Sequence, residues 1–399
     1  MPRGLRSTVA AVVLALSLVA ASACGDSDSE GSSSGELVLG TQDKPAVLPT
    51  FDDIEAVDSG ADPESGTLRI YNYNEYINPD TISAFEKEFD VKIQVTGYDS
   101  EDEVTQKLNS GAVKADLVMG ITQQSLPRLA AGKLLQPLNP ELLPNSTNVA
   151  PALADPYYDK GAVYTRPYIV YKTGITYRND FVEPSVVEEK GWDILWDPAY
   201  KGYVGLLDDS RETISLALLY AGETDLNTGD QAKLDQAVSD LKDLVAKTNA
   251  RVDAGIYQKI PDGTFHVAQD WSGDAVNGQY YLPEGTDVSV LGFWNPKVTP
   301  VGNDLFAVLA GAEKPALAHA FINFMLDPEN AQQNFEYVGY QPATKKPTVQ
   351  DLIDAELVPE NLRNTIVTEK EIKDGLYQYA LDTPTQTKWE DAWSTFKAG

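Results

Sequence analysis

The stretch TLRIYNY at residues 67–73, followed by TISAFEKEFD at residues 81–90, decides the fold class. Apolar and polar residues alternate in the first piece, which is typical of a strand with one buried face. In the second piece Ile82, Phe85 and Phe89 recur at helical spacing, which predicts an amphipathic helix. The folded part of the chain therefore begins with a strand and a helix, the repeating unit of α/β proteins.

The alternation of strands and helices continues along the chain. The pattern predicts strands at 91–98, 115–120 and 202–209, and helices at 101–111, 210–222, 234–248 and 316–326. Short apolar strands separated by helices indicate an α/β layer with a mainly parallel sheet. Ligands of such sheets bind outside the carboxyl ends of the strands, so the residues directly after each strand are the candidate site residues.

The N-terminus carries the features of a secretory signal peptide. Arg3 and Arg6 precede an uncharged apolar run from Val9 to Ala21, and small residues lead up to Cys24. This run is shorter than the ~20 residues that a membrane-spanning helix needs. Residues 1–23 are therefore predicted to be a signal peptide, which places the mature protein outside the cytoplasm.

Cys24 is the only cysteine of the chain. Its position directly after Ala21, Ser22 and Ala23, and directly before Gly25, resembles the lipobox of bacterial lipoproteins, although the lipobox usually has Leu where this chain has Ala21. Ordinary cleavage that leaves a free thiol is the alternative, but an exposed lone cysteine is a liability in an oxidising compartment. The prediction is a lipid anchor at Cys24 on the outer face of the cell membrane.

Residues 24–66 are predicted to form the lipid anchor and a flexible tether. The segment is rich in Ser, Gly, Asp and Pro and lacks the apolar density of a core. Its GSSSG at 31–35 matches the G-x-S-x-G of serine hydrolases only formally, because that motif works on a strand-turn-helix. The rest of the chain is long enough for two domains.

The chain is strongly acidic. It has 60 Asp and Glu residues against 31 Lys and Arg, a formal net charge of −29. Such a charge argues against nucleic acid or an anionic membrane as the main partner. It permits a cationic ligand, although acidity that serves only solubility is the alternative.

Carboxylates and aromatic side chains recur together at the predicted strand ends. These residues are Tyr73, Asn74, Glu75 and Tyr76 after the first strand, Asp209, Arg211 and Glu212 after the strand at 202–209, Trp271 after FHVAQDW, and Asp304 near VGNDLFAVLA. A polyamine needs both types, since carboxylates bind its ammonium groups and ring faces pack on its methylenes and charges. Helix capping by Asp209 and simple packing of the tyrosines are the alternatives.

From about Thr67 to its end the chain resembles the spermidine/putrescine-binding proteins of ABC importers. The resemblance lies in YNYNEY (71–76), WDPAYKGYVGLLDDSRE (196–212), DWSGDA (270–275), VGYQP (338–342) and KDGLYQ (373–378). It implies an α/β, two-lobed periplasmic-binding-protein fold of type II, each lobe a mainly parallel sheet flanked by helices, with a two-stranded hinge near Thr173 and Gly302. Lobe 1 would comprise residues 67–173 plus 303–350, and lobe 2 residues 174–302 plus 351–399.

The resemblance also implies which residues bind the ligand. Carried over position by position, it assigns Tyr73, Asn74, Glu75, Tyr76, Asp209, Arg211, Glu212, Trp271, Asp304, Tyr340 and Gln378. Asp209 and Glu212 would bind amines, Arg211 would hold these carboxylates in place, and Asp304 would hold a terminal ammonium. Tyr73 stands where the family usually has a stacking Trp.

Two further departures fall in the predicted pocket. Ile121, Thr122 and Gln123 stand where the family often has Ser-Thr-Tyr, and Gly302 stands where it usually has Trp. The departures bear on which amine is bound more than on the class of ligand.

The function that follows is capture of a polyamine between two closing lobes and its delivery to an ABC importer. The predicted partners are the small polyamine and a permease in the membrane, and the resemblance implies a monomer without metal or cofactor. A sugar, amino acid or metal chelate on the same fold, a sensor, or a secreted carboxylate-dependent hydrolase are the alternatives. His266 and His319, the two histidines, have no metal-binding spacing, and phosphate-loop and dinucleotide motifs are missing from the sequence, which argues against an enzyme.

Overall fold

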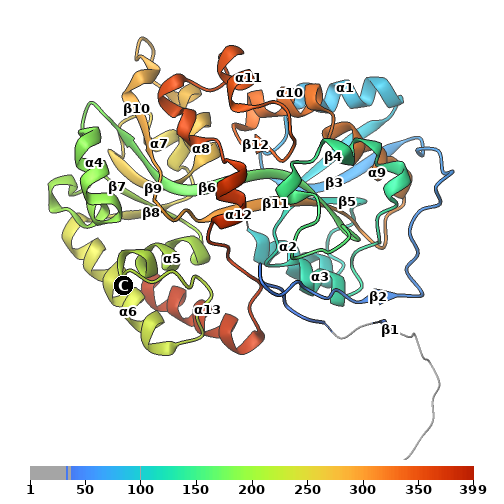
Figure 1. The fold of residues 1–399 in the computed structure, drawn as a ribbon, viewed down its shortest axis with the longest axis horizontal. Coiled ribbons are helices and arrows are strands. Elements are labelled where there is room, and N and C mark those ends of the chain that lie inside the picture. Colours follow the sequence, from blue (N-terminus) through green and yellow to red (C-terminus); the bar gives the residue numbers. More distant parts are fainter. Residues whose placement is uncertain (1–32, 35–36, 99) are drawn as a thin grey trace, which may run out of the picture.

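The computed structural model describes residues 33–34, 37–98 and 100–399 (Figure 1). The predicted signal peptide and Cys24 lie outside these residues. Within the described part of the chain, no helix combines the length and the apolar character that crossing a membrane requires.

Ten strands form one curled sheet, in the order β4-β3-β5-β11-β6-β9-β7-β8, with β10 and β12 also paired to β6. Their bounds are β3 (Thr67–Tyr73), β4 (Lys92–Tyr98), β5 (Leu117–Ile121), β6 (Thr165–Arg178), β7 (Val204–Leu207), β8 (Arg251–Asp253), β9 (Val267–Trp271), β10 (Leu291–Trp294), β11 (Val301–Val308) and β12 (Gln341–Pro342). A separate two-stranded pair consists of β1 (Ser33–Ser34) and β2 (Thr50–Phe51).

The sheet is mixed rather than uniformly parallel. Strand β3 runs parallel to β4 and β5, and β7 runs parallel to β8 and β9. Strands β6 and β11 are antiparallel to each other, and each is antiparallel to its neighbour on the other side. The parallel pairs that the strand-helix alternation predicts therefore lie toward the two ends of the sheet, and the antiparallel pairs lie at its centre.

Strand β6 connects the two halves of the molecule (Figure 1). Its residues 165–172 pair with β11, and its residues 173–177 pair with β9, so the partner changes at Thr173. Strand β11 begins at Val301, beside this change of partner. Below, lobe 1 and lobe 2 denote the residue ranges predicted above.

The helices flank the sheet. Their bounds are α1 (Pro79–Phe89), α2 (Glu101–Asn109), α3 (Leu126–Ala131), α4 (Pro184–Lys190), α5 (Ser210–Tyr220), α6 (Gln231–Thr248), α7 (Ile256–Lys259), α8 (Ser272–Asn277), α9 (Pro315–Met325), α10 (Pro328–Val338), α11 (Val349–Asp354), α12 (Glu369–Asp374) and α13 (Thr383–Lys397). Short 3-10 helices are η1 (Pro140–Leu142), η2 (Pro144–Asn148), η3 (Pro151–Leu153), η4 (Gly191–Trp196), η5 (Pro198–Tyr200), η6 (Gly278–Tyr281), η7 (Val288–Val290) and η8 (Glu360–Thr365). The strands and helices predicted from the sequence are confirmed to within a few residues.

Local sequence explains where the helices near the strand ends begin. Helix α1 starts at Pro79, whose fixed φ suits a first helical residue, after Asn78 accepts a hydrogen bond from the backbone N–H of Asp80. Helix α5 starts after Asp209, whose side chain accepts from the backbone N–H of Glu212 at 2.8 Å. The capping role considered for Asp209 is therefore present.

Each lobe has its own apolar core. Around β3, β5 and β11 the core contains residues such as Leu68, Phe85 and Phe321, whereas around β7 and β9 it contains residues such as Leu206 and Phe265. Residues near the C-terminal end of the chain belong to both cores. Val367, Ile372 and Tyr377 join the first core, although the predicted lobe boundaries place them in lobe 2.

The segment 37–66 differs from the flexible tether that its composition predicts. Ala46 is buried and its backbone N–H donates to the carbonyl of Tyr157 at 2.8 Å, and Leu48 packs against the core around Tyr98. Glu64 accepts from the backbone N–H groups of α9. A few apolar residues and backbone hydrogen bonds thus hold this segment against lobe 1. The low overall hydrophobicity of the segment did not indicate this packing.

Candidate ligand-binding site

A continuous series of aromatic rings lies where the two lobes meet. Tyr73 at the end of β3 contacts Tyr76, with ring centroids 5.8 Å apart, and Tyr76 contacts Tyr340 at 5.3 Å. Tyr171 of β6 continues the series, with its ring 6.3 Å from both Tyr340 and Trp271. Four predicted aromatic residues therefore come together, and Tyr171, which the sequence analysis did not single out, connects them.

Asp304 lies in β11 beside these rings. It is buried, and its carboxylate accepts a hydrogen bond from the Tyr76 hydroxyl at 2.8 Å. The neighbouring Asn303 instead donates its amide to the Tyr158 hydroxyl, because successive side chains of a strand point to opposite faces. Burial raises the pKa of Asp304 well above its ordinary value.

Glu212 and Asp209 approach the same region from lobe 2. The Glu212 carboxylate is buried and accepts from the Thr173 hydroxyl at 2.9 Å. Burial, together with the charge of Asp209, raises the pKa of Glu212 to about 7. Near neutral pH this carboxylate therefore exchanges between its neutral and charged forms.

Glu101 is a fourth carboxylate of this region, and it was not among the predicted residues. It is the first residue of α2, and it accepts from the backbone N–H of Thr122 at 2.6 Å, from the Thr122 hydroxyl at 2.9 Å and from the Ser125 hydroxyl. Burial, and then the charge of Asp209 across the lobe interface, raise its pKa. It stands just past the end of β4, so the strand-end rule applied consistently would have found it.

Tyr171 lies within electrostatic range of all four carboxylates. Burial raises the pKa of its phenol well above the ordinary value, and the charges of Asp304, Glu212, Asp209 and Glu101 raise it further. Two of these carboxylates come from lobe 1 and two from lobe 2. The site therefore combines anions from both lobes with ring faces.

Gln378 forms hydrogen bonds with residues of both lobes. Its side-chain oxygen accepts from the amide of Gln124 at 3.1 Å, its backbone carbonyl accepts from the amide of Gln123 at 2.9 Å, and its own amide donates to Ser215. A small cavity of about 10 Å³ is lined here by Gln123, Gln124, Tyr171, Thr173, Glu212, Pro300, Val301, Gly302, Leu376 and Gln378.

The hydrogen bonds of Arg211 go to other parts of lobe 2. Its guanidinium donates to the carbonyl of Tyr379, to the carbonyl of Leu226 and to the side chain of Asn227, and it lies 4.6 Å from the ring of Trp389. These contacts tie the C-terminal segment to α5. Burial lowers the pKa of Arg211 to about 10, while the charges of Asp209 and Glu212 act in the opposite direction.

Asn74 and Glu75 lie at the rim. Both are exposed, and Glu75 has a φ of 55°, in the left-handed region. The charge of Glu75 contributes to the raised pKa values of Tyr257 in lobe 2 and Tyr337 in lobe 1. The structure therefore does not bring these two residues into the buried cluster.

A pair of buried carboxylates lies behind the aromatic series. Asp274 accepts from the Tyr340 hydroxyl at 2.6 Å, which fixes that ring between the lobes. Burial raises the pKa of Asp274 to about 7, and burial with the charge of Asp274 raises that of Asp270 well above its ordinary value. Two buried like charges in one cluster disfavour ionisation of both groups, so each carboxyl holds its proton to a higher pH than usual.

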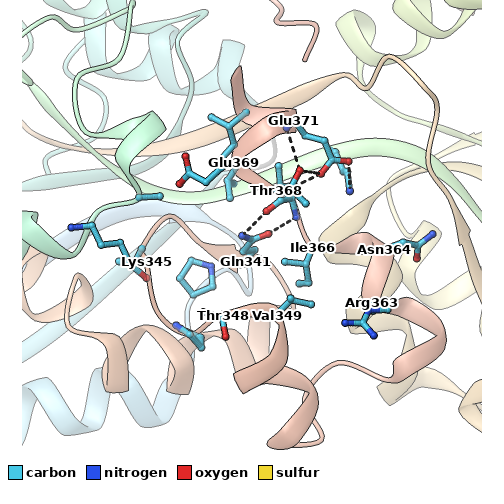
Figure 2. A pocket seen from close by; sticks show the side chains of 18 of the residues that line it. Gln341, Lys345, Thr348, Val349, Arg363, Asn364, Ile366, Thr368, Glu369 and Glu371 are labelled. Carbon is cyan, nitrogen blue, oxygen red and sulfur yellow. Dashed lines mark hydrogen bonds and ion pairs between the residues drawn. The ribbon is translucent and has the colours of Figure 1, made fainter. Parts of the chain in front are cut away.

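A larger pocket of about 720 Å³ lies on the opposite face of β6 (Figure 2). Lys172 lines it, because Lys172 alternates with Tyr171 and Thr173 along the strand. The buried Lys172 ammonium forms an ion pair with Glu371 of α12 at 2.6 Å, and Asn295 donates to the same carboxylate. Lys345 and Arg363 lie on opposite sides of the pocket (Figure 2), so its charges do not converge.

The fold and the interlobe site define a class of protein, and the comparison of sequences agrees. The family described as bacterial extracellular solute-binding protein matches residues 80–356. This match covers more than half of the chain, so the chain belongs to the family of bacterial extracellular solute-binding proteins.

Individual relatives are similar along most of their length. The spermidine/putrescine-binding periplasmic protein of Escherichia coli K12 is 29% identical over 341 residues, which cover 84% of this chain and 93% of the relative. The putrescine-binding periplasmic protein PotF of the same organism is 28% identical over 352 residues, covering 84% and 92%.

A solved structure supports the same fold. The spermidine/putrescine ABC transporter substrate-binding protein from Streptococcus pneumoniae superimposes with a TM-score of 0.67 at 26% identity, covering 84% of this chain and 99% of that one. The present fold is therefore that of the two-lobed periplasmic binding proteins, as the sequence analysis predicts.

Proposed function

We propose that this protein captures a polyamine such as spermidine or putrescine between its lobes and delivers it to an ABC importer, without catalysing a reaction. The proposal is supported chiefly by the chemistry of the interlobe site. Glu101, Glu212 and Asp304 accept hydrogen bonds from hydroxyls and a backbone amide, and none of these donors carries a charge. Arg211 is one cation near Glu212 and Glu101. A cationic ligand would supply further positive charge to the carboxylates, and the names of the relatives agree with a polyamine.

The contacts that such a site offers are strong enough for micromolar binding of a polyamine. A desolvated cation-π contact contributes about 2 kcal/mol, and a charge-assisted hydrogen bond contributes about 1.5 to 3 kcal/mol. A few of each reach the roughly −8 kcal/mol of micromolar binding after the cost of association is subtracted. Because carboxylates come from both lobes, the ligand would stabilise the closed arrangement of the lobes.

The direct test is calorimetry of the mature protein with putrescine, spermidine, spermine and a neutral sugar. We expect heat of binding with at least one amine and none with the sugar, because only a cation neutralises the buried carboxylates. Heat with the sugar alone would end the polyamine proposal and favour another solute on the same fold.

We also propose that Cys24 carries a lipid that holds the protein at the outer face of the membrane, next to a permease, and that the protein works as a monomer. The proposal rests on the lipobox-like sequence before Cys24. Cys24→Ala should release the protein from membranes into the soluble fraction, as followed by fractionation and immunoblotting. A variant that stays with the membrane would refute acylation at this cysteine.

A further inference from the structure

Tyr171 and Gly302 face each other across the two strands that join the lobes. They are register partners of β6 and β11. A Cβ atom added to Gly302 would lie 2.4 Å from Cζ and 2.5 Å from the hydroxyl oxygen of Tyr171, which is closer than atoms can approach. The Tyr171 ring therefore lies directly over Gly302, and a side chain at residue 302 would have to displace it.

The position of this ring places it inside the candidate site. Tyr171 and Gly302 both line the small cavity, together with Thr173 and Glu212. The next residue of β6, Lys172, points to the opposite face of the strand and is held there by its ion pair with Glu371. The strand alternation thus keeps Tyr171 on the side of the cavity.

The ring is also close to carboxylates of both lobes, and it lines the same cavity as Glu212. Asp304 and Glu101 belong to lobe 1, Asp209 and Glu212 belong to lobe 2, and the charges of all four act on the Tyr171 phenol. An amine that reaches both groups has to pass along this ring. The space that the ring fills is not open to further methylene and ammonium groups of the ligand.

We propose that Tyr171 is the specificity-determining residue that limits the length of the amine accepted, by filling the space over Gly302 between the carboxylates of the two lobes. The inference rests on the proposed polyamine function. With the ring in place the cavity measures only about 10 Å³. Removal of the ring would extend it along the hinge strands.

The test compares binding of putrescine and spermine by titration calorimetry. Tyr171→Ala should raise the affinity for spermine relative to that for putrescine by about tenfold or more, a change of about 1.4 kcal/mol. Tyr171→Phe should leave the ratio unchanged, because the ring remains. If Tyr171→Ala does not fold, Tyr171→Leu, which also shortens the side chain, should shift the ratio in the same direction.

A matched glycine controls for general effects on the sheet. Gly292 of β10 pairs with Tyr177 of β6, and an added Cβ would lie 2.3 Å from Cζ of that tyrosine, away from the cavity. Gly302→Ala and Gly292→Ala should both lower the melting temperature. Only Gly302→Ala should change the ratio of amine affinities, since only it displaces a ring of the site.

The outcomes separate the inference from the function on which it rests. A wild-type protein that binds amines, with an unchanged ratio in Tyr171→Ala or an equal change in both glycine variants, would overturn the role of Tyr171 alone. A wild-type protein that binds no amine would remove the proposed function and this inference with it.

Discussion

Glu212→Gln and Asp304→Asn should each weaken amine binding by at least about tenfold, because each removes a buried charge that would face an ammonium group. A charge-assisted hydrogen bond contributes about 1.5 to 3 kcal/mol, and every 1.4 kcal/mol corresponds to about tenfold in affinity. Both residues are buried beside neutral donors, so water screens their charges little. Titration calorimetry measures the loss.

Asp208→Asn is the matched control for these variants. Asp208 directly precedes Asp209, but it is exposed and forms an ion pair with Lys397 at 2.8 Å. Its replacement removes one exposed negative charge next to Asp209 and should leave amine affinity unchanged. Undiminished affinity in both Glu212→Gln and Asp304→Asn would show that the ammonium groups bind elsewhere.

The pKa of Glu212 adds a pH dependence with a definite sign. Burial raises the pKa of Glu212 in the folded protein to about 7, above its value in the unfolded chain. The contribution of Glu212 to the stability of the ligand-free protein is therefore complete below the unfolded-state pKa. It is lost as the pH rises through about 7. The amine requires the charged form, so affinity should rise over the same window. Glu212→Gln should flatten the part of the pH profile near neutrality, as measured by calorimetry across buffers.

Glu371→Gln should destabilise the fold by about 3 to 5 kcal/mol, because it leaves the Lys172 ammonium buried without its charge partner. The side chain of Lys172 is only 2% exposed, and its ion pair with Glu371 is 2.6 Å long. The pair joins β6 to α12 on the face of the strand opposite the ligand site. Denaturant unfolding, with CD as the signal, measures the change.

Lys370→Gln is the control within the same helix. Lys370 and Asp374 form an ion pair whose side chains are 84% and 62% exposed, and such pairs contribute roughly 0 to 1 kcal/mol. The double variant Lys172→Met with Glu371→Gln should recover much of the lost stability, since no buried charge then remains. A Glu371→Gln protein as stable as Lys370→Gln would contradict this account.

Much of the candidate site could be predicted because it follows the ends of strands. Tyr73, Tyr76, Glu212 and Trp271 stand at the ends of predicted strands or within three residues of them, and the structure brings them together. The carboxyl ends of strands in such sheets meet at one edge, so local patterns are enough to find these residues. Glu101 follows the same rule.

Other features depend on contacts between distant parts of the chain. Tyr171 lies in the middle of a strand, and its place in the site depends on where β6 changes partner from β11 to β9. The hydrogen bonds of Arg211 go to Leu226, Asn227 and Tyr379, which loops bring close only in the folded protein. The antiparallel pairing of β6 with β11 is likewise invisible in a pattern of strands and helices.

The late return of the chain to both cores has a consequence for how the protein is made. The first core needs residues from Leu68 to Tyr377, and the core around α5 and α13 needs residues from Ile175 to Phe396. Neither can be completed by a nascent chain before almost all of it has left the ribosome, so folding should follow synthesis rather than accompany it. A chain that stays unfolded until then can still be threaded through a secretion channel.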